Sequence, residues 1–210
     1  DYIAERMLKI REQHGPEAMA LFSHGIGGKF LKHTMKAYGS PNITAPSFAQ
    51  CRGPRDVGFK LTFGEEVGSP ECTDIKHARC LVLIGSHLGE NMHNTQVQEF
   101  AEAVEKGASI ICVDPRLAAG KAKYYLPIKP GTDIALLLAW MHVLVKENLY
   151  DREYVEQHGF GFDAFKAYIE PFTPEWAFTE TTIDPDVIRE TAREMGRFRP
   201  ASLVHPGRHA

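Results

Sequence analysis

The sequence predicts an α/β fold: a doubly wound, mostly parallel sheet with helices on both faces. Strand patterns at residues 18–22, 80–84 and 109–114 each end in a turn, and helical patterns lie between them. Strands that alternate with helices are typical of parallel sheets, because a parallel connection needs a crossover. We therefore expect a Rossmann-like dinucleotide-binding domain with part of a neighbouring αβ domain.

The remaining elements follow from helical periodicity and from helix stop signals. Residues 133–147 form a strongly apolar helix after a Pro–Gly–Thr–Asp turn, in which Thr132 or Asp133 is the expected N-cap. The segment 41–56 contains three prolines and is predicted to be an exposed, rigid loop. Further helices are predicted at 2–14, 30–38, 150–155, 162–169 and 182–196, and a last strand at 201–205.

The composition excludes some classes of protein. The 210 residues are 43% hydrophobic and 24% charged, which suits a globular chain with one substantial core. A net charge of −3 gives no reason to expect nucleic acid as a partner. No apolar run is long enough to span a bilayer. The chain starts without Met and ends on a strand pattern, so we expect a segment of a longer protein whose localisation signals lie elsewhere.

None of the four cysteines forms a CxxC pair or a zinc or iron–sulfur spacing. Cys80 and Cys112 fall inside strand patterns and are expected to be small buried hydrophobes. Cys51 lies in the proline-containing loop, beside two arginines. Positive charge favours the thiolate, so Cys51 is a candidate nucleophile or soft-metal ligand, and a structural cysteine is the alternative.

Polar residues follow the two strongest strand patterns. Gly85, His87 and Glu90 come after the first, and Asp114 and Arg116 come after the second. The carboxyl ends of parallel strands share one edge of the sheet, where phosphate-bearing ligands bind near helix N-termini. A carboxylate there can accept hydrogen bonds from a ribose or a guanine, and an arginine can pair with phosphate.

Simpler interpretations stand beside these. Asp114 can be a turn former, and Glu90 suits the first turn of a helix because of the helix dipole. Helix capping alone is sufficient to explain Gly131–Asp133. A zinc site that includes His87 and His93 lacks a recognised ligand spacing.

Taken in order, five segments resemble the catalytic subunits of the molybdopterin oxidoreductases, the dimethyl sulfoxide reductase family. Ser47–Gly58 resembles the metal-ligating cysteine loop, and Gly85–Glu90 resembles the family's Gly–x–Asn–x–x–Glu/Asp turn. Val113–Arg116 is close to its Asp–Pro–Arg, and Leu126–Leu136 contains its Pro–Gly–Thr–Asp–x–Ala–Leu motif. Asn148–Val155 fits the segment that follows, so the resemblance covers nearly all of the chain.

The resemblance implies a molybdenum or tungsten ion held by two molybdopterin guanine dinucleotides and by the Cys51 thiolate at the catalytic centre. It implies that Gly207 and Arg208 approach the pterin. The residues implied to line one guanine dinucleotide are Gly85, His87, Glu90, Asp114, Arg116, Gly131 and Asp133.

The chain departs from the family in two respects. His87 stands where the family commonly has Asn, and the N-terminal cysteine cluster for a [4Fe–4S] centre is absent, so that cluster is expected upstream. We expect the end of a neighbouring αβ domain at 1–45, the dinucleotide domain at 46–200, and the start of the return into the core domain at 201–210. These 210 residues alone are expected to be inactive, because half of the cofactor shell lies elsewhere.

Within the family, Cys51–Arg55 and Gly207–His209 look most like the polysulfide, thiosulfate and tetrathionate reductase branch. That likeness implies two-electron reduction or atom transfer on a sulfur oxyanion or polysulfide, in anaerobic respiration. Formate dehydrogenase, nitrate reductase and arsenate reductase are the alternatives, so the substrate is a small inorganic or one-carbon molecule. The implied partners are an iron–sulfur electron-transfer subunit and a membrane anchor subunit. A periplasmic or extracytoplasmic location is favoured, and a cytoplasmic one is the alternative.

Two other classes of protein compete with this interpretation. A nicotinamide-dependent dehydrogenase domain is disfavoured, because Gly25–Gly28 does not continue into a GxGxxG fingerprint. A non-catalytic scaffold subunit that kept the fold and lost the metal is disfavoured by Cys51 in its loop. Bound metal and guanine nucleotide in the full-length protein distinguish all three.

Overall fold

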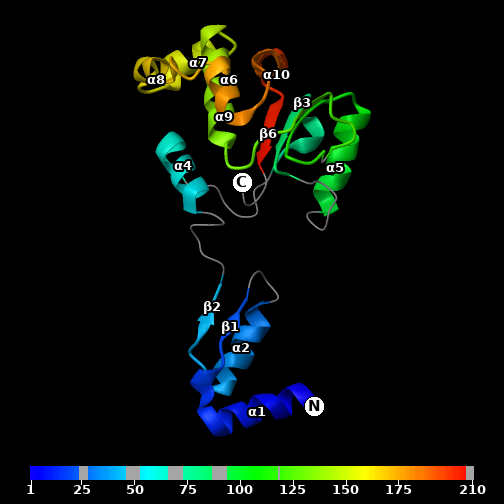
Figure 1. The fold of residues 1–210 in the computed structure, drawn as a ribbon, viewed down its shortest axis with the longest axis vertical. Helices are drawn as coiled ribbons and strands as arrows, with labels where there is room; N and C mark the ends of the chain where they lie inside the picture. Colours follow the sequence, from blue (N-terminus) through cyan, green and yellow to red (C-terminus); the bar gives the residue numbers. More distant parts are fainter. Residues whose placement is uncertain (24–27, 46–52, 66–72, 87–93, 118, 207–210) are drawn as a thin grey trace. The chain divides into compact units, whose positions relative to one another are not determined.

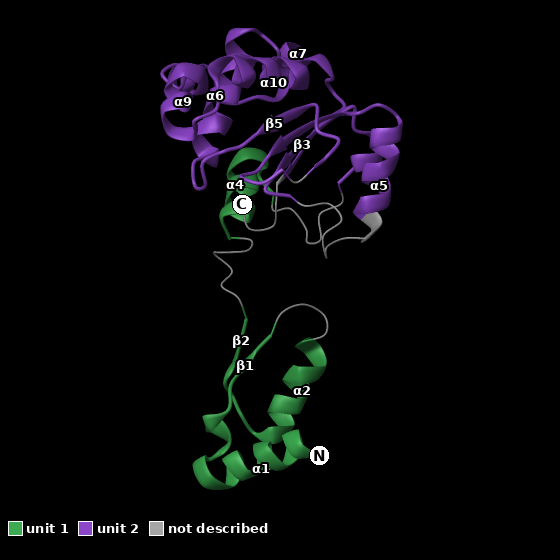
Figure 2. Cartoon of the chain, turned by 45° about the vertical axis from the view of Figure 1, so that its right-hand side comes forward, with its two compact units in different colours: residues 1–71 green, residues 72–210 purple. Residues whose placement is uncertain are grey.

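The computed structural model divides the chain into two compact units, Asp1–Glu71 and Cys72–Ala210 (Figure 2). The structure describes residues 1–23, 28–45, 53–65, 73–86, 94–117 and 119–206. The boundaries predicted at 45 and 200 follow sequence motifs and stay a prediction.

Unit 1 contains a small parallel sheet of two strands. Strand β1 (Leu21–Phe22) pairs with β2 (Ile43–Thr44). The strand predicted at 18–22 is therefore shorter than expected, and it belongs to this two-stranded sheet and not to the same sheet as the strands at 80–84 and 109–114. The Tyr38 hydroxyl donates a hydrogen bond to the Met7 carbonyl at 2.9 Å and joins two helices. The helices of this unit are α1 (Tyr2–His14), α2 (Gly28–Tyr38) and α4 (Gly53–Phe63), with a 3-10 turn η1 (Pro16–Ala18).

The loop predicted at 41–56 is wrong at both of its ends. Strand β2 occupies Ile43–Thr44, and α4 begins at Gly53. Proline is tolerated in the first turn of a helix, because the amide hydrogen that it lacks has no partner inside the helix there. Pro54 therefore allows a helix to begin at this point.

Unit 2 is built on a four-stranded sheet in the order β5-β4-β3-β6, and every pair of neighbours is parallel. All residues of β3 and β4 are buried, as expected for strands covered on both faces. The strands predicted at 80–84, 109–114 and 201–205 are confirmed within one residue. The strands are β3 (Cys80–Ile84), β4 (Ser109–Val113), β5 (Tyr124–Leu126) and β6 (Ser202–Pro206).

Helices cover both faces of this sheet, which confirms the doubly wound fold (Figure 1). Val82 and Ile84 pack on one face with α6, α9 and α10. Leu81 and Leu83 pack on the other face with α5 and the 3-10 turn η2 (Ile75–His77). The helices are α5 (Asn94–Glu105), α6 (Asp133–Lys146), α7 (Arg152–His158), α8 (Phe162–Ile169), α9 (Pro174–Thr181) and α10 (Pro185–Arg197).

Helix α10 forms a buried hydrogen bond with α6 and lies close to the side chain of Leu149, just beyond the end of α6. Trp140 Nε1 donates to Thr191 Oγ1 at 2.9 Å, and both residues are buried. Gly196 lies so close to Leu149 that a Cβ added to the glycine would be 2.8 Å from the leucine Cβ. The sequence therefore needs a residue without a side chain at the end of α10.

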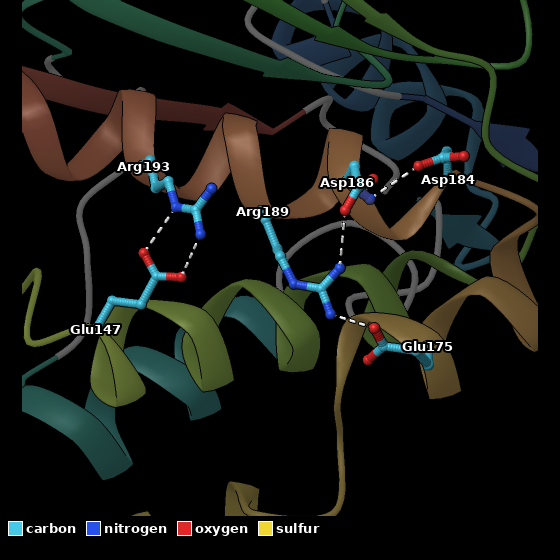
Figure 3. Close-up of polar contacts among 6 residues, drawn as sticks. All are labelled: Glu147, Glu175, Asp184, Asp186, Arg189 and Arg193. Atoms are coloured by element: carbon cyan, nitrogen blue, oxygen red, sulfur yellow. Dashed lines mark hydrogen bonds and ion pairs between the residues drawn. The ribbon is translucent and has the colours of Figure 1, made fainter.

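Ion pairs join α10 to α9 and to Glu147, the residue that follows α6 (Figure 3). Arg193 donates two hydrogen bonds to the Glu147 carboxylate, each at 2.8 Å. Arg189 pairs with Glu175 of α9 and with Asp186 in the first turn of its own helix. Every one of these side chains is at least partly exposed to solvent, so we expect each pair to contribute little to stability.

Candidate functional site

The carboxyl ends of the four strands meet at one edge of the unit 2 sheet, because all of its strands are parallel. Gly85 directly follows β3, and Asp114 directly follows β4. Ile84 and Val113 are paired in the register, and the Gly85 amide donates to the Val113 carbonyl at 2.9 Å. The structure thus brings together two residues that the sequence predicted for one ligand.

Asp114 is 4% exposed and is held in a fixed position. Its Oδ1 accepts a hydrogen bond from the Arg116 amide at 2.7 Å, and its own amide donates to the Leu126 carbonyl at 3.2 Å. The turn-forming role is therefore present in the structure, and Arg116 is exposed beside it. A carboxylate fixed in this way at a strand end loses little conformational freedom when it binds a ligand.

The turn between β5 and α6 places Gly131 and Asp133 beyond the carboxyl end of β5. Gly131 has φ +83°, a left-handed conformation that glycine adopts without steric cost. Thr132 occupies the N-cap position, but its hydroxyl donates to the Lys129 carbonyl at 2.7 Å and does not cap the helix. Asp133 is the first residue of α6, where the helix dipole stabilises a carboxylate.

Five of the predicted site residues lie outside the part of the chain that the structure describes: Cys51, His87, Glu90, Gly207 and Arg208. Their roles stay predictions. Across the described ranges, no cluster of three or more His, Cys, Asp or Glu side chains could hold a metal ion. Within those same ranges, no helix has the length and apolar character needed to cross a membrane.

Ser86 and His205 form a contact at this edge that the sequence did not predict. Ser86 is 7% exposed, and its Oγ lies 2.9 Å from Nδ1 of His205. His205 belongs to β6, the strand beside β3. The two residues are 119 positions apart in the sequence, and Ser86 occupies a position that the motif of the Gly85–Glu90 turn leaves unspecified. The one signal available was the position of each at a strand end.

The strand order marks where a ligand is expected along this edge. From β3 the chain moves outward through β4 to β5, and it then returns to the opposite side of β3 as β6. The order therefore reverses between β3 and β6, and open α/β sheets bind their ligands at such a switch point. The ends of β3 and β6 carry Gly85, Ser86 and His205.

The side chains at the edge favour a ligand with two kinds of group. The oxygens of Asp114 and Asp133 can accept hydrogen bonds, so they suit ribose hydroxyls or the N–H groups of a guanine. Arg116 suits a phosphate. The fold defines a doubly wound α/β domain, a class that binds its ligands beyond the carboxyl ends of its strands.

Comparison with known proteins identifies the family. The family model described as "Molybdopterin oxidoreductase" matches residues 1–207, so the chain belongs to the molybdopterin oxidoreductase family. Membership implies a pterin cofactor that carries molybdenum or tungsten. The resemblance found in the sequence is thereby confirmed at the level of the family.

Three relatives illustrate the range of this similarity. The thiosulfate reductase molybdopterin-containing subunit PhsA of Salmonella typhimurium is 36% identical over 99% of this chain and 27% of its own length. The F420-dependent formate dehydrogenase 1 subunit alpha of Methanococcus maripaludis is 38% identical over 71% of this chain and 22% of its own length. The structure of acetylene hydratase from Pelobacter acetylenicus matches with a TM-score of 0.71 and 27% identity, covering 99% of this chain and 29% of that one.

The chain therefore spans less than a third of the length of these relatives. Their names include a reductase, a dehydrogenase and a hydratase. Membership of the family consequently leaves the reaction of the whole protein open.

Proposed function

We propose that the whole protein is a molybdenum or tungsten bis(molybdopterin guanine dinucleotide) oxidoreductase that reduces a sulfur oxyanion or polysulfide. One observation carries the proposal: the neighbouring strands β3 and β4 end in Gly85 and Asp114 at a single edge of the sheet, and Asp133 begins the helix that follows β5. The similarity to PhsA over nearly all of this chain supports the substrate class.

The described residues fit one guanine dinucleotide. Asp114 and Asp133 supply acceptors for the guanine or ribose, and Arg116 supplies a cation for a phosphate. Gly85 has φ +56° and lacks a Cβ, so the backbone can approach the ligand closely. We propose that His87 and Glu90 line the same guanine dinucleotide.

The reacting end of the cofactor is assigned to residues outside the described part of the chain. Cys51 is the proposed metal ligand, and Gly207 and Arg208 are proposed to approach the pterin. A metal ion held in this way supplies two-electron chemistry when bound, and a soft thiolate suits it. With thiosulfate as substrate, two electrons and two protons enter as the S–S bond breaks, giving sulfite and hydrogen sulfide.

Formate dehydrogenase is the second candidate function. The observation in its favour is the formate dehydrogenase subunit of Methanococcus maripaludis, which is 38% identical over 71% of this chain. Nitrate reductase of Symbiobacterium thermophilum is 31% identical over 93% of this chain, so nitrate reduction should also be tested. Arsenate reduction should be tested with it.

The proposal extends to the protein's surroundings. We place a [4Fe–4S] cluster upstream of this chain, and we place the enzyme with an iron–sulfur electron-transfer subunit and a membrane anchor subunit in anaerobic respiration. PhsA is itself named as a subunit, which supports an assembly of this kind. The extracytoplasmic location predicts a twin-arginine signal in the upstream sequence.

The first experiment measures cofactor content. The full-length protein, produced anaerobically, should contain molybdenum or tungsten and release GMP on acid hydrolysis. Asp114→Asn should lower the GMP content, because it replaces one of the two accepting oxygens with an NH2 group, which cannot accept a hydrogen bond from the ligand. Glu175→Gln, on the exposed surface of α9, is the control and should keep the wild-type content. A wild-type protein with neither metal nor GMP would overturn the proposal in favour of a scaffold subunit.

The second experiment identifies the substrate. Reduction of thiosulfate, tetrathionate, polysulfide, nitrate and arsenate should be followed with a reduced dye, and formate oxidation with an oxidised one. We expect turnover of a sulfur substrate that is abolished in Cys51→Ala. Formate turnover without sulfur turnover would replace the main proposal with the second candidate.

A further inference from the structure

We propose that Ser86 and His205 form a clasp across the switch point of the sheet, which positions the two strand exits around the phosphate-bearing part of the dinucleotide. This inference rests on the proposed function. It assigns Ser86 and His205 as positioning residues, because neither is required to touch the reacting atoms.

The location of the contact carries the argument. Ser86 lies just beyond the end of β3, and His205 lies in the last two residues of β6. The strand order reverses between these two strands, so their exits flank the position where an open α/β sheet binds its ligand. The hydrogen bond of 2.9 Å joins the two exits directly at that position.

Strand pairing does not need this bond. Backbone pairing already joins β3 to β6 at five register positions, from Cys80↔Ser202 to Ile84↔Pro206. Ser86 lies two residues beyond the last of these pairs, where the chain leaves the sheet. Burying a hydroxyl against an imidazole at this edge carries a desolvation cost, which an apolar pair would avoid. The clasp therefore acts on the exits of the strands, not on the sheet.

The hydrogen bond can persist in every protonation state of the imidazole. When Nδ1 carries no proton, it accepts a hydrogen bond from the Ser86 hydroxyl. When Nδ1 carries a proton, it donates to Ser86 Oγ. The clasp therefore holds the imidazole ring in one orientation at the edge where the dinucleotide is proposed to bind.

The test compares the release of guanine nucleotide from full-length holoenzyme variants. Ser86→Ala and His205→Leu remove the clasp, and His205→Asn keeps a nitrogen close to the position of Nδ1. Ser202→Ala is the matched control, because the Ser202 hydroxyl donates to the Met195 carbonyl at 2.6 Å at the opposite end of β6. The holoenzymes are warmed, filtered at intervals, and hydrolysed in acid so that retained GMP can be counted.

We expect Ser86→Ala and His205→Leu to release guanine nucleotide about fivefold faster than the wild type, since a typical hydrogen bond contributes about 1 kcal/mol. His205→Asn should restore part of the retention, and Ser202→Ala should behave like the wild type. Unfolding midpoints of the four variants separate cofactor release from loss of the fold. A purely structural role would lower the midpoint of Ser86→Ala and leave the release rate unchanged.

The outcomes distinguish this inference from the proposed function. A wild-type enzyme that contains no guanine nucleotide contradicts the proposed function itself. A wild-type enzyme that contains it, with equal release from Ser86→Ala and Ser202→Ala, overturns only the clasp.

Discussion

Glu194 and Asp114 are buried carboxylates at opposite edges of the same sheet. Asp114 follows β4, whereas Glu194 of α10 accepts hydrogen bonds from Ser109, the first residue of β4, and from Lys123, both at 2.6 Å. Burial alone would raise the pKa of Glu194, but the hydrogen bonds from Lys123 and Ser109 and the charge of Lys123 outweigh it and lower the pKa. At the amino ends of the strands, the Glu194 carboxylate thus has hydrogen-bond partners within the protein. The ligand is assigned to the opposite edge, at the carboxyl ends of the strands, where Asp114 lies.

The Glu194 contact predicts a pH-dependent contribution to stability. Glu194→Gln should reduce the free energy of unfolding at pH 7 by about 1–2 kcal/mol, because a buried charge-assisted bond to a half-exposed lysine is lost. The lowered folded-state pKa means that this contribution is present above the unfolded value of about 4.3 and is lost as pH falls through the folded value. Urea unfolding at pH 7 and at a series of pH values below about 4.3 measures the difference in unfolding free energy between wild type and variant, which should narrow as the pH falls.

Glu147→Gln is the matched control for that prediction. Glu147 also has a pKa lowered by its hydrogen bonds to Arg193, but this pair lies on the surface. Its loss should cost less than about 1 kcal/mol. Equal losses in the two variants would show that burial does not strengthen the Glu194 contact.

At the residue scale, the sequence predicts which residues directly follow a strand, but it does not predict which side chains on neighbouring strands contact each other. Gly85 and Asp114 are predictable because each directly follows an apolar run. The Ser86–His205 contact depends on β6 lying beside β3, which no local pattern indicates. Thr132 takes the N-cap position that the sequence predicts for it or for Asp133, but its hydroxyl donates to the Lys129 carbonyl and makes no cap hydrogen bond.

At the element scale, the length of the pattern decides which elements can be predicted. The five-residue runs of β3 and β4 are continuous and buried, so their bounds are predicted closely. Strand β5 was missed, because it has three residues and Leu126 is its one fully buried side chain. Helix α9 was also missed, although Thr173 accepts a hydrogen bond from the Trp176 amide and Pro174 begins the helix. Those two residues are a start signal that could have revealed it.

The buried hydrogen bond between α6 and α10 should contribute more to the free energy of unfolding than the surface ion pair between Arg193 and Glu147. Thr191→Val keeps the shape but leaves the Trp140 N–H buried without its acceptor, so it should cost about 1–3 kcal/mol of unfolding free energy. Arg193→Ala removes a surface pair and should cost less than about 1 kcal/mol. Urea unfolding followed by tryptophan fluorescence measures both. A larger loss in Arg193→Ala would assign the contact to the ion pairs of Figure 3 instead.

At the scale of the whole molecule, the hydrophobic core belongs to unit 2. Both clusters of buried apolar residues lie between Ile75 and Leu203, one on each face of the four-stranded sheet. Among the described residues of unit 1, Met35 and Tyr38 of α2 are the buried large apolar side chains, helix α1 has no buried residue, and Phe22 and Phe30 are more than two-thirds exposed. A chain of about 70 residues with so little buried apolar surface gains too little to offset its conformational entropy.

This asymmetry predicts that residues 72–210 fold without unit 1, whereas residues 1–71 do not fold alone. A polypeptide of residues 72–210 should show a single cooperative unfolding transition in urea, with a free energy within the range of about 5–15 kcal/mol usual for small domains. Both tryptophans, Trp140 and Trp176, lie in unit 2, so their fluorescence reports on this unit alone even in the full chain. The transition should have the same midpoint in 1–210 and in 72–210, because no described residue of unit 1 belongs to either buried cluster. A midpoint that falls when unit 1 is removed would mean that unit 1 stabilises the sheet domain, and circular dichroism of 1–71 then tests whether it folds by itself.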